Sequence, residues 1–173
     1  MVGERSLDTE PPPRPWRLSS RLLLVDDNDR LLLIRAYDPR EPAGGEWWEV
    51  PGGGVELGED TAAAAVRETA EETGYRVPLD RVGPPCWTGD VTYRWARRRW
   101  WSSIVMHLAG VDHPLDWGPH QRLADEESCF VEVGWVALAH VQAGRRYFPG
   151  SLAADLPRLL AGERVDAPFS RWN

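Results

Sequence analysis

Two short apolar runs mark the first strands of the chain. Positions 22–25 read Leu-Leu-Leu-Val and positions 31–34 read Leu-Leu-Leu-Ile, around a polar Asp/Asn turn at 26–29. Apolar runs that flank such a turn predict a β-hairpin. Neither run alternates with polar residues, which is typical of strands that are covered on both faces. The pattern therefore predicts helices on both sides of a sheet.

The segment 61–73 is the clearest predicted helix. It is rich in Ala and Glu, with Asp60 or Thr61 placed to cap its start and Gly74 placed to end it. Just before it, three glycines at 52–54 follow Pro51. Because glycine lacks a side chain, this turn lets the backbone approach a ligand closely. The glycine turn can therefore add backbone groups to a site on the helix.

The rest of the chain mixes strands with one more helix. A loop at 38–46, strands at 47–50 and 130–138, and a hairpin of strands 91–95 and 100–108 with a basic turn at 97–98 are expected. Leucines at 152, 156, 159 and 160 form a helical stripe over 151–160, where Pro157 must sit in the first turns or kink the helix. A chain of 173 residues fits one core. We predict a single domain over 16–165, with a flexible proline-rich arm at 1–15 and a tail at 166–173.

Composition and charge limit the classes of partner. Hydrophobic residues make up 42% of the chain and its formal net charge is −7, so a globule without an overall positive field is expected. A nucleic-acid polymer is therefore not an expected partner. The two cysteines, Cys86 and Cys129, have no metal-binding spacing and should be reduced. No apolar stretch reaches the roughly 20 residues of a membrane span, so we expect no membrane partner and a cytoplasmic location.

Three carboxylates are expected along one turn of the 61–73 helix. Glu68 and Glu72 are four residues apart and share a face, and Glu71 lies three residues from Glu68. Carboxylates this close repel one another, and hard oxygen ligands at this spacing suit Mg²⁺. An exposed acidic face with an ion pair between Arg67 and Glu71 would have the same spacing. The helix alone leaves both interpretations open.

The residues around the helix distinguish the two interpretations. From Gly53 the chain reads GGVELGEDTAAAAVRETAEETGY, in which the spaced glycines, glutamates and arginine are Gly53, Glu59, Arg67, Glu68, Glu71, Glu72 and Gly74. These fill all seven fixed positions of the Nudix box, a match expected by chance about once in 10⁹ start sites when each residue type is taken as roughly one in twenty. From Gly53 to Tyr75 the chain therefore resembles the MutT-like proteins of the Nudix hydrolase superfamily. Thr69 and Tyr75 stand where the family has large aliphatics. Thr69 should point inward, with its hydroxyl bonded to a carbonyl three or four residues back.

The resemblance implies a fold, a reaction and a cofactor. The fold is α/β, an α/β/α sandwich around a mixed β-sheet. The reaction is hydrolysis of a diphosphate bond in a nucleoside diphosphate linked to another group, by a metal-activated water, with Mg²⁺ as the cofactor and Mn²⁺ as a substitute. Glu68 and Glu72 would be the main metal ligands, Glu71 an additional or water-bridged ligand, and the Gly53 carbonyl a further one.

The resemblance also assigns roles outside the metal ligands. Glu59 would help to hold the site, and Arg67 would orient the glutamates through ion pairs. The general base can come from the box or from a later loop, here 124–128, where Glu126 and Glu127 are candidates and an acidic solvent-facing turn is the alternative. Trp47 and Trp48 lead into the glycine turn and are candidates for stacking on the substrate. A small nucleotide-like diphosphate is the expected partner, and because dimers are common in the family, a homodimer is a further candidate.

Two other functions fit the same scaffold. An isomerase of an isoprenoid diphosphate would need an acid/base pair such as a cysteine and a glutamate, and Cys86 is its candidate cysteine. A non-catalytic binding or regulatory module normally shows lost box glutamates, whereas all of them are present here. Fold resemblance does not settle function, so the intact set of glutamates carries the hydrolase hypothesis. Nothing in the sequence names the base or sugar of a substrate.

Overall fold

The computed structural model of the chain describes residues 16–112, 116–141 and 145–173, so the predicted arm at 1–15 lies outside the described residues. The strands are β1 (Trp16–Asp26), β2 (Arg30–Ala36), β3 (Trp47–Glu49), β4 (Gly52–Gly54), β5 (Tyr75–Arg76), β6 (Val82–Trp95), β7 (Arg98–Val111), β8 (Asp116–Trp117), β9 (Phe130–Ala137), β10 (Tyr147–Phe148), β11 (Val165–Asp166) and β12 (Ser170–Trp172). The helices are α1 (Thr61–Thr73), α2 (Ala124–Cys129) and α3 (Leu152–Leu160), with short 3₁₀ turns at Pro42–Gly44, Leu79–Arg81 and Leu138–His140.

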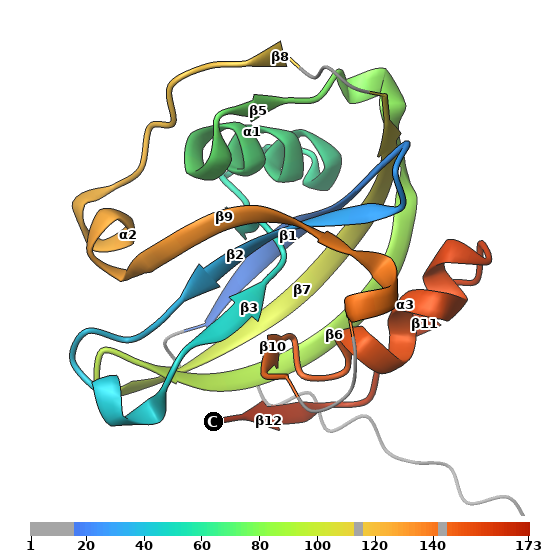
Figure 1. Cartoon of the computed structure of the whole chain (residues 1–173). Helices are drawn as coiled ribbons and strands as arrows, with labels where there is room; N and C mark the ends of the chain where they lie inside the picture. Colours follow the sequence, from blue (N-terminus) through green and yellow to red (C-terminus); the bar gives the residue numbers. More distant parts are fainter. Residues whose placement is uncertain (1–15, 113–115, 142–144) are drawn as a thin grey trace, which may run out of the picture.

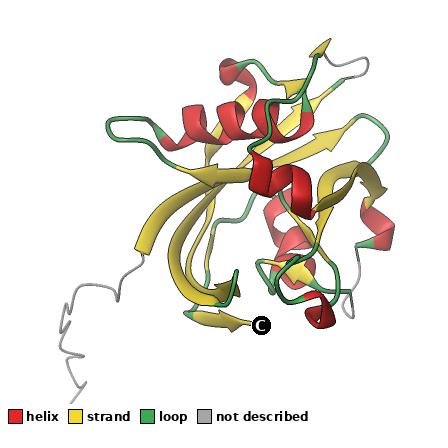
Figure 2. Ribbon diagram, turned by 90° about the vertical axis from the view of Figure 1, so that its left-hand side faces the viewer, coloured by secondary structure: helices red, strands yellow, loops and turns green. Residues whose placement is uncertain are grey.

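A ten-stranded mixed sheet organises most of the described residues, and β5 and β8 pair in a separate two-stranded sheet (Figure 1). The strand order of the large sheet is β10-β3-β2-β1-β7-β6-β11, and β4, β9 and β12 pair with β1, β2 and β6 respectively. The central strand β1 runs parallel to β7 and antiparallel to β2 and β4. The long strands curve strongly when seen from the side (Figure 2). This arrangement confirms the mixed sheet of the predicted fold class.

The apolar runs of β1 and β2 are buried on both faces, as the sequence predicts. Leu22 to Leu24 and Leu31 to Ile34 are all completely buried. Successive side chains of a strand point to opposite faces, and they join two separate clusters here. Leu23, Leu31 and Leu33 pack with α3, whereas Leu22, Leu24 and Leu32 pack with α1. The two helices therefore cover opposite faces of the sheet.

Helix α1 begins and ends where its local signals predict. The Asp60 carboxylate accepts a hydrogen bond from the backbone N–H of Ala62 at 2.8 Å, and Gly74 adopts a left-handed conformation with φ of 81°. Thr69 is fully buried and its hydroxyl donates to the Ala65 carbonyl at 2.7 Å. Both expectations for Thr69 are confirmed. The helix is thereby held at fixed ends against β1 and β4.

The predicted second hairpin is present but longer than the sequence indicates. Strand β6 starts at Val82 and continues through Pro84 and Pro85, and its register against β7 shifts on both sides of Pro85. Such irregularities let a strand accommodate proline, which cannot donate to a neighbouring strand. The turn itself is formed by Ala96 and Arg97, both with positive φ.

The end of the chain returns to the sheet. The sequence predicts a tail over 166–173, and within it Ser170–Trp172 forms β12, which pairs parallel with β6. The Trp172 ring lies 5.1 Å from the Trp47 ring and 5.1 Å from the Phe148 ring, centroid to centroid. These contacts bring the chain end beside β3 and β10.

One local prediction is wrong. The segment 124–128, predicted as a loop, lies in the six-residue helix α2, because its backbone closes helical bonds such as Glu127 N–H to the Leu123 carbonyl. Across the three described ranges, no helix is both long and apolar enough to cross a membrane.

Candidate active site

The glycine turn and helix α1 are brought together by β1. Strand β4 pairs with β1, with Ser20 opposite Gly53, and the Ser20 hydroxyl donates to the Thr61 carbonyl at the start of α1 at 2.6 Å. A Cβ atom on Gly53 would lie only 2.5 Å from the carboxyl carbon of Glu68. Glycine at 53 is therefore required for the Glu68 carboxylate to sit against the turn.

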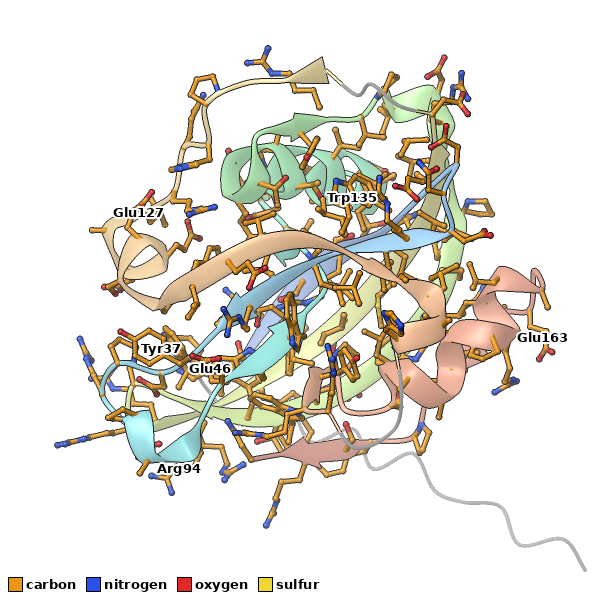
Figure 3. All side chains as sticks on the ribbon, in the orientation of Figure 1. Tyr37, Glu46, Arg94, Glu127, Trp135 and Glu163 are labelled. Atoms are coloured by element: carbon orange, nitrogen blue, oxygen red, sulfur yellow. The ribbon has the colours of Figure 1, made fainter. Side chains whose placement is uncertain are left out.

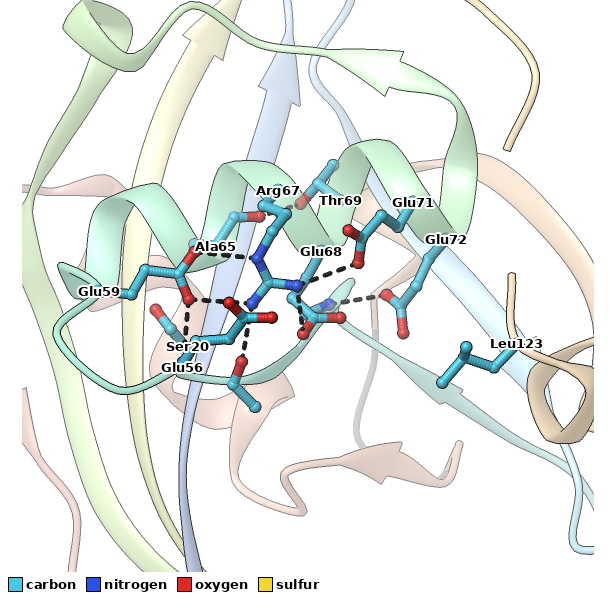
Figure 4. A network of polar contacts seen from close by, with 12 residues as sticks. Ser20, Glu56, Glu59, Ala65, Arg67, Glu68, Thr69, Glu71, Glu72 and Leu123 are labelled. Atoms are coloured by element: carbon cyan, nitrogen blue, oxygen red, sulfur yellow. Dashed lines mark hydrogen bonds and ion pairs between the residues drawn. The ribbon is translucent and has the colours of Figure 1, made fainter. Parts of the chain in front are cut away.

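Arg67 connects three of the candidate glutamates (Figure 4). Its guanidinium makes a two-pronged ion pair with Glu59 at 2.9 and 3.0 Å, and one nitrogen contacts both Glu68 and Glu71 at 3.0 Å. The same guanidinium donates to the Gly54 carbonyl at 2.9 Å. The hydrogen bond from Arg67 lowers the pKa of Glu59. Arg67 thus ties the glycine turn to the carboxylates of the helix.

Glu72 is the most deeply buried of these carboxylates. It is only 4% exposed, and it accepts a hydrogen bond from the Gly52 N–H at 2.8 Å. Burial raises the pKa of Glu72 well above its usual value, and repulsion from Glu49 and Glu68 adds to this rise. Burial also raises the pKa of Glu68, although Arg67 opposes it. Glu68 and Glu72 are therefore two carboxylates removed from water whose negative charges repel each other.

This donor set fits a hard divalent cation. Among the described residues, no three carboxylate, histidine or cysteine side chains already converge as a metal centre. Instead Glu68 and Glu71 share Arg67, and Glu72 is turned to the Gly52 N–H. Yet buried carboxylates that repel each other are stabilised by a cation, and oxygen ligands are those Mg²⁺ prefers. By the chemistry of their oxygen donors, these carboxylates are suited to hold a divalent cation.

A cleft of about 650 Å³ runs from these carboxylates to an aromatic region. One half is lined by Gly52, Gly53, Gly54, Glu49, Glu56, Glu68, Glu71, Glu72, Asp125 and Glu126. The other half is lined by Trp47, Tyr93, Trp95, Trp100, Phe148 and Trp172, and Arg17, Arg21, Arg67 and Arg94 also border the cleft. The second half comes from β3, β6, β7, β10 and β12, which are distant in sequence.

Sequence reasoning missed most of this second half. The Trp-rich composition was the available signal, but only the structure places the rings around one cleft. Arg94 lies near the 3₁₀ turn at Pro42–Gly44, where it pairs with Glu41 at 2.8 Å (Figure 3). Glu49 is a further missed residue, since it borders the cleft and accepts a hydrogen bond from the Trp47 indole at 2.8 Å.

The remaining candidates are divided between the cleft and its surroundings. Trp47 lines the cleft, whereas Trp48 is absent from its lining and lies with its ring 5.8 Å from the Arg35 guanidinium. Glu126 lines the cleft and accepts a hydrogen bond from the Leu123 N–H at 2.7 Å. Glu127, labelled in Figure 3, contacts His120 at 3.2 Å instead. Geometry therefore favours Trp47 and Glu126 for contact with a ligand.

Both cysteines are free, and they differ in position. Cys86 does not line the cleft, and its thiol donates to the Met106 carbonyl at 3.3 Å. Cys129 borders the cleft, but burial raises the pKa of its thiol to about 12. A thiol with that pKa is a weak acid and a poor nucleophile at neutral pH.

Known proteins resemble this chain over most of its length. The NUDIX domain model matches residues 15–156. A relative from Roseobacter denitrificans, named RNA pyrophosphohydrolase, is 33% identical over 142 residues, covering 72% of this chain and 79% of the relative. A protein of the same name from Novosphingobium aromaticivorans is 28% identical over 135 residues, covering 68% of this chain and 78% of that protein.

Solved structures share the fold. The MutT protein from Bacillus halodurans superposes with a TM-score of 0.61 at 19% identity, over 89% of each chain. The Ap4A hydrolase from C. elegans superposes with a TM-score of 0.55 at 22% identity, over 84% of this chain and 98% of that one. The family model spans β1 to β10, including the glycine turn and α1, so the chain belongs to the NUDIX domain family and is a Nudix hydrolase.

Proposed function

We propose that this Nudix hydrolase uses Mg²⁺, or Mn²⁺ in its place, to hydrolyse a nucleoside diphosphate linked to another group. The observation that carries the proposal is the pair of the half-buried Glu68 and the buried Glu72 beside the glycine turn, in a cleft that is also lined by aromatic rings. Carboxylates suit the metal and aromatic rings suit a flat base. A nucleoside diphosphate would span the two halves, with its phosphates at the carboxylates and its base at the rings.

The chain's own residues have distinct roles in this proposal. Glu68 and Glu72 would hold the metal, with Glu71 and the Gly53 carbonyl as further ligands. Arg67 keeps Glu68 and Glu71 oriented through its ion pairs, and Glu59 anchors Arg67 from the other side. A bound Mg²⁺ supplies charge that neutralises the diphosphate and lowers the pKa of a water molecule.

Glu126 is the better-placed candidate for the general base. It borders the cleft together with Glu68 and Glu72, whereas Glu127 is turned to His120. Its carboxylate would take the proton of the attacking water while the bond between phosphorus and the bridging oxygen breaks. Geometry is the first requirement for a base, and Glu126 meets it more closely than Glu127.

The 5′ end of an RNA is a second candidate substrate. Relatives carry the name RNA pyrophosphohydrolase. Arg97, Arg98 and Arg99 are exposed at the β6–β7 turn, whose flanking residues Tyr93, Arg94 and Trp95 line the cleft. A local basic surface can hold phosphates even on a chain with a net negative charge. The prediction from net charge that no nucleic-acid polymer is a partner therefore stays a prediction. The predicted homodimer also stays a prediction.

The isomerase and binding-module alternatives receive less support. Cys86 lies outside the cleft, and the high pKa of Cys129 makes it a weak proton donor. All the box glutamates are in place around the cleft or around Arg67. Hydrolysis therefore accounts for more of the site than either alternative.

Product release from a panel of compounds tests the proposal. The panel holds nucleoside triphosphates, nucleotide sugars, ADP-ribose, dinucleoside polyphosphates and a 5′-triphosphorylated RNA, each with Mg²⁺ and with a chelator. We expect cleavage of at least one compound at its diphosphate bond, lost with the chelator and lowered by about 100-fold or more in Glu72→Gln. Turnover that persists with the chelator, or no turnover of any compound, contradicts the proposal.

A further inference from the structure

One cation lies buried beneath the glycine turn. Arg21 of β1 is only 4% exposed, yet it borders the cleft. Its guanidinium donates to the Val50 carbonyl and lies 4.8 Å from the centre of the Phe148 ring. A guanidinium has five N–H donors, and within the described part of the chain the Val50 carbonyl is the one hydrogen-bond acceptor that Arg21 has. Most of its donors are therefore unused.

The glycine turn is built around this side chain. A Cβ atom on Gly52 would lie 2.6 Å from the Arg21 Cα and 2.8 Å from its Cγ. Gly52 also donates its N–H to Glu72, so Arg21, the turn and the buried carboxylate are packed in direct succession. Arg21 is thus in contact with the turn that holds the Glu72 carboxylate.

Arg21 also contacts the aromatic half. The Phe148 ring under its guanidinium lies 5.2 Å from Tyr93 and 5.1 Å from Trp172, which both line the cleft. Arg21 therefore stands where the two halves meet. A ligand that has its phosphates at Glu72 and its base among the rings would therefore lie against Arg21.

Burying an arginine with few hydrogen bonds costs free energy unless a partner completes them. The other arginines of the cleft differ in this respect, because Arg17 and Arg94 are exposed and Arg94 already pairs with Glu41. An anion in the cleft would accept hydrogen bonds from the N–H groups of Arg21 that have no acceptor, and a planar guanidinium can bind two phosphate oxygens at once.

We propose that Arg21 is a substrate-binding residue that donates hydrogen bonds to the diphosphate of the substrate, at the boundary between the carboxylate and aromatic halves of the cleft. The inference rests on the proposed function, since it assumes that a diphosphate enters this cleft. It adds a residue outside the Nudix box to the groups that recognise the substrate.

Binding of imidodiphosphate, a non-hydrolysable diphosphate without a base, tests the role of Arg21. Calorimetry with Mg²⁺ compares the intact protein with Arg21→Gln, Arg21→Lys and the remote control Arg158→Gln, whose side chain pairs with Glu163 at the surface. We expect Arg21→Gln to weaken binding by about 10- to 100-fold, as for the loss of a hydrogen bond between charged groups. Arg21→Lys, which keeps the charge and the aliphatic stem, should lose less, and the control should bind as the intact protein does.

A second titration separates substrate binding from a structural role. Mn²⁺ alone, followed by electron paramagnetic resonance, should bind to Arg21→Gln within about threefold of its affinity for the intact protein. Equal losses of Mn²⁺ and imidodiphosphate affinity would show that Arg21 only positions the carboxylates, and would overturn the inference. So would unchanged imidodiphosphate binding in Arg21→Gln, or no binding by the intact protein. If Arg21→Gln does not fold, Arg21→Lys decides: a loss of imidodiphosphate affinity with Mn²⁺ affinity kept supports the contact, whereas unchanged imidodiphosphate affinity or equal losses for both ligands overturn it.

The two proposals can fail separately. If the intact protein cleaves a compound of the panel and Arg21→Gln keeps the same KM, only the inference on Arg21 fails. If the intact protein cleaves nothing, the proposed function fails first.

Discussion

Replacing Gly53 with alanine tests how closely Glu68 must sit against the glycine turn. The added Cβ atom would lie 2.5 Å from the Glu68 carboxyl carbon, whereas ordinary contact begins at about 3.4 Å, so the carboxylate must move by about 0.9 Å. A displacement of about 1 Å in a catalytic group can cost 100-fold in rate. We therefore expect kcat/KM to fall by about 100-fold in Gly53→Ala, which corresponds to about 2.7 kcal/mol of transition-state stabilisation.

The fold should tolerate the same change. The atoms that must move are the end of a flexible side chain, and a rotamer change costs about 1 kcal/mol. Urea unfolding should therefore show a loss of no more than about 1 kcal/mol in the free energy of unfolding. Activity and stability are thus expected to separate in this variant.

The two neighbouring glycines provide matched controls. A Cβ atom on Gly54 meets no heavy atom within 4 Å, so Gly54→Ala should keep activity and stability near those of the intact protein. Gly52 has φ of 143° and its Cβ atom would lie 2.3 Å from the Ser20 carbonyl, so Gly52→Ala should lose about 3 kcal/mol of stability. Equal activity in Gly53→Ala and Gly54→Ala would refute the role given to the position of Glu68.

Three further predictions concern charge, core and aromatic packing. Burial raises the pKa of Glu72 above that of the unfolded chain, so its contribution to stability is fully present below about pH 4.3 and is lost as pH rises through the folded pKa. In thermal unfolding, the Tm of the metal-free protein should therefore fall more between pH 5 and pH 8 than the Tm of Glu72→Gln does. Added Mg²⁺ should raise the Tm of the intact protein more at pH 8 than at pH 5. Parallel pH profiles of Tm for the two proteins would contradict the destabilising effect of the Glu72 charge. Thr69→Val should change the free energy of unfolding by less than about 1 kcal/mol, since the Ala65 carbonyl keeps its helical N–H partner, and a larger loss in urea unfolding would contradict this. Trp172→Ala removes two edge-to-face ring pairs and should lower the free energy of unfolding by about 2 kcal/mol, whereas Trp172→Phe should lose less; equal losses would argue against the ring contacts.

Local signals were enough to predict the elements that position the carboxylates proposed as metal ligands. Helix α1 carries its own cap at Asp60 and its own stop at Gly74, and both act within a few residues. The uninterrupted apolar runs of β1 and β2 likewise predict that these strands are buried on both faces. Such features depend on neighbours in the chain, which a sequence shows directly.

The aromatic half of the cleft depends on contacts between distant segments. Trp172 meets Trp47 across 125 positions, and nothing in the pattern of residues 166–173 predicts a strand. Arg21 gives no local signal either, because a charged residue at the start of an apolar run is normally exposed. Helix α2 is too short for a helical period to be recognised against an acidic turn. These features follow from how the sheet is assembled, which the sequence pattern does not specify.

Mn²⁺ binding to the intact protein and to Glu72→Gln tests most directly whether Glu68 and Glu72 together hold a divalent cation. Electron paramagnetic resonance measures the free ion, and Glu46→Gln, which changes an exposed carboxylate paired with Arg35, is the matched control. The account predicts that the intact protein and Glu46→Gln bind Mn²⁺ alike and that Glu72→Gln binds it at least about tenfold more weakly. Equal affinities in all three proteins would contradict it.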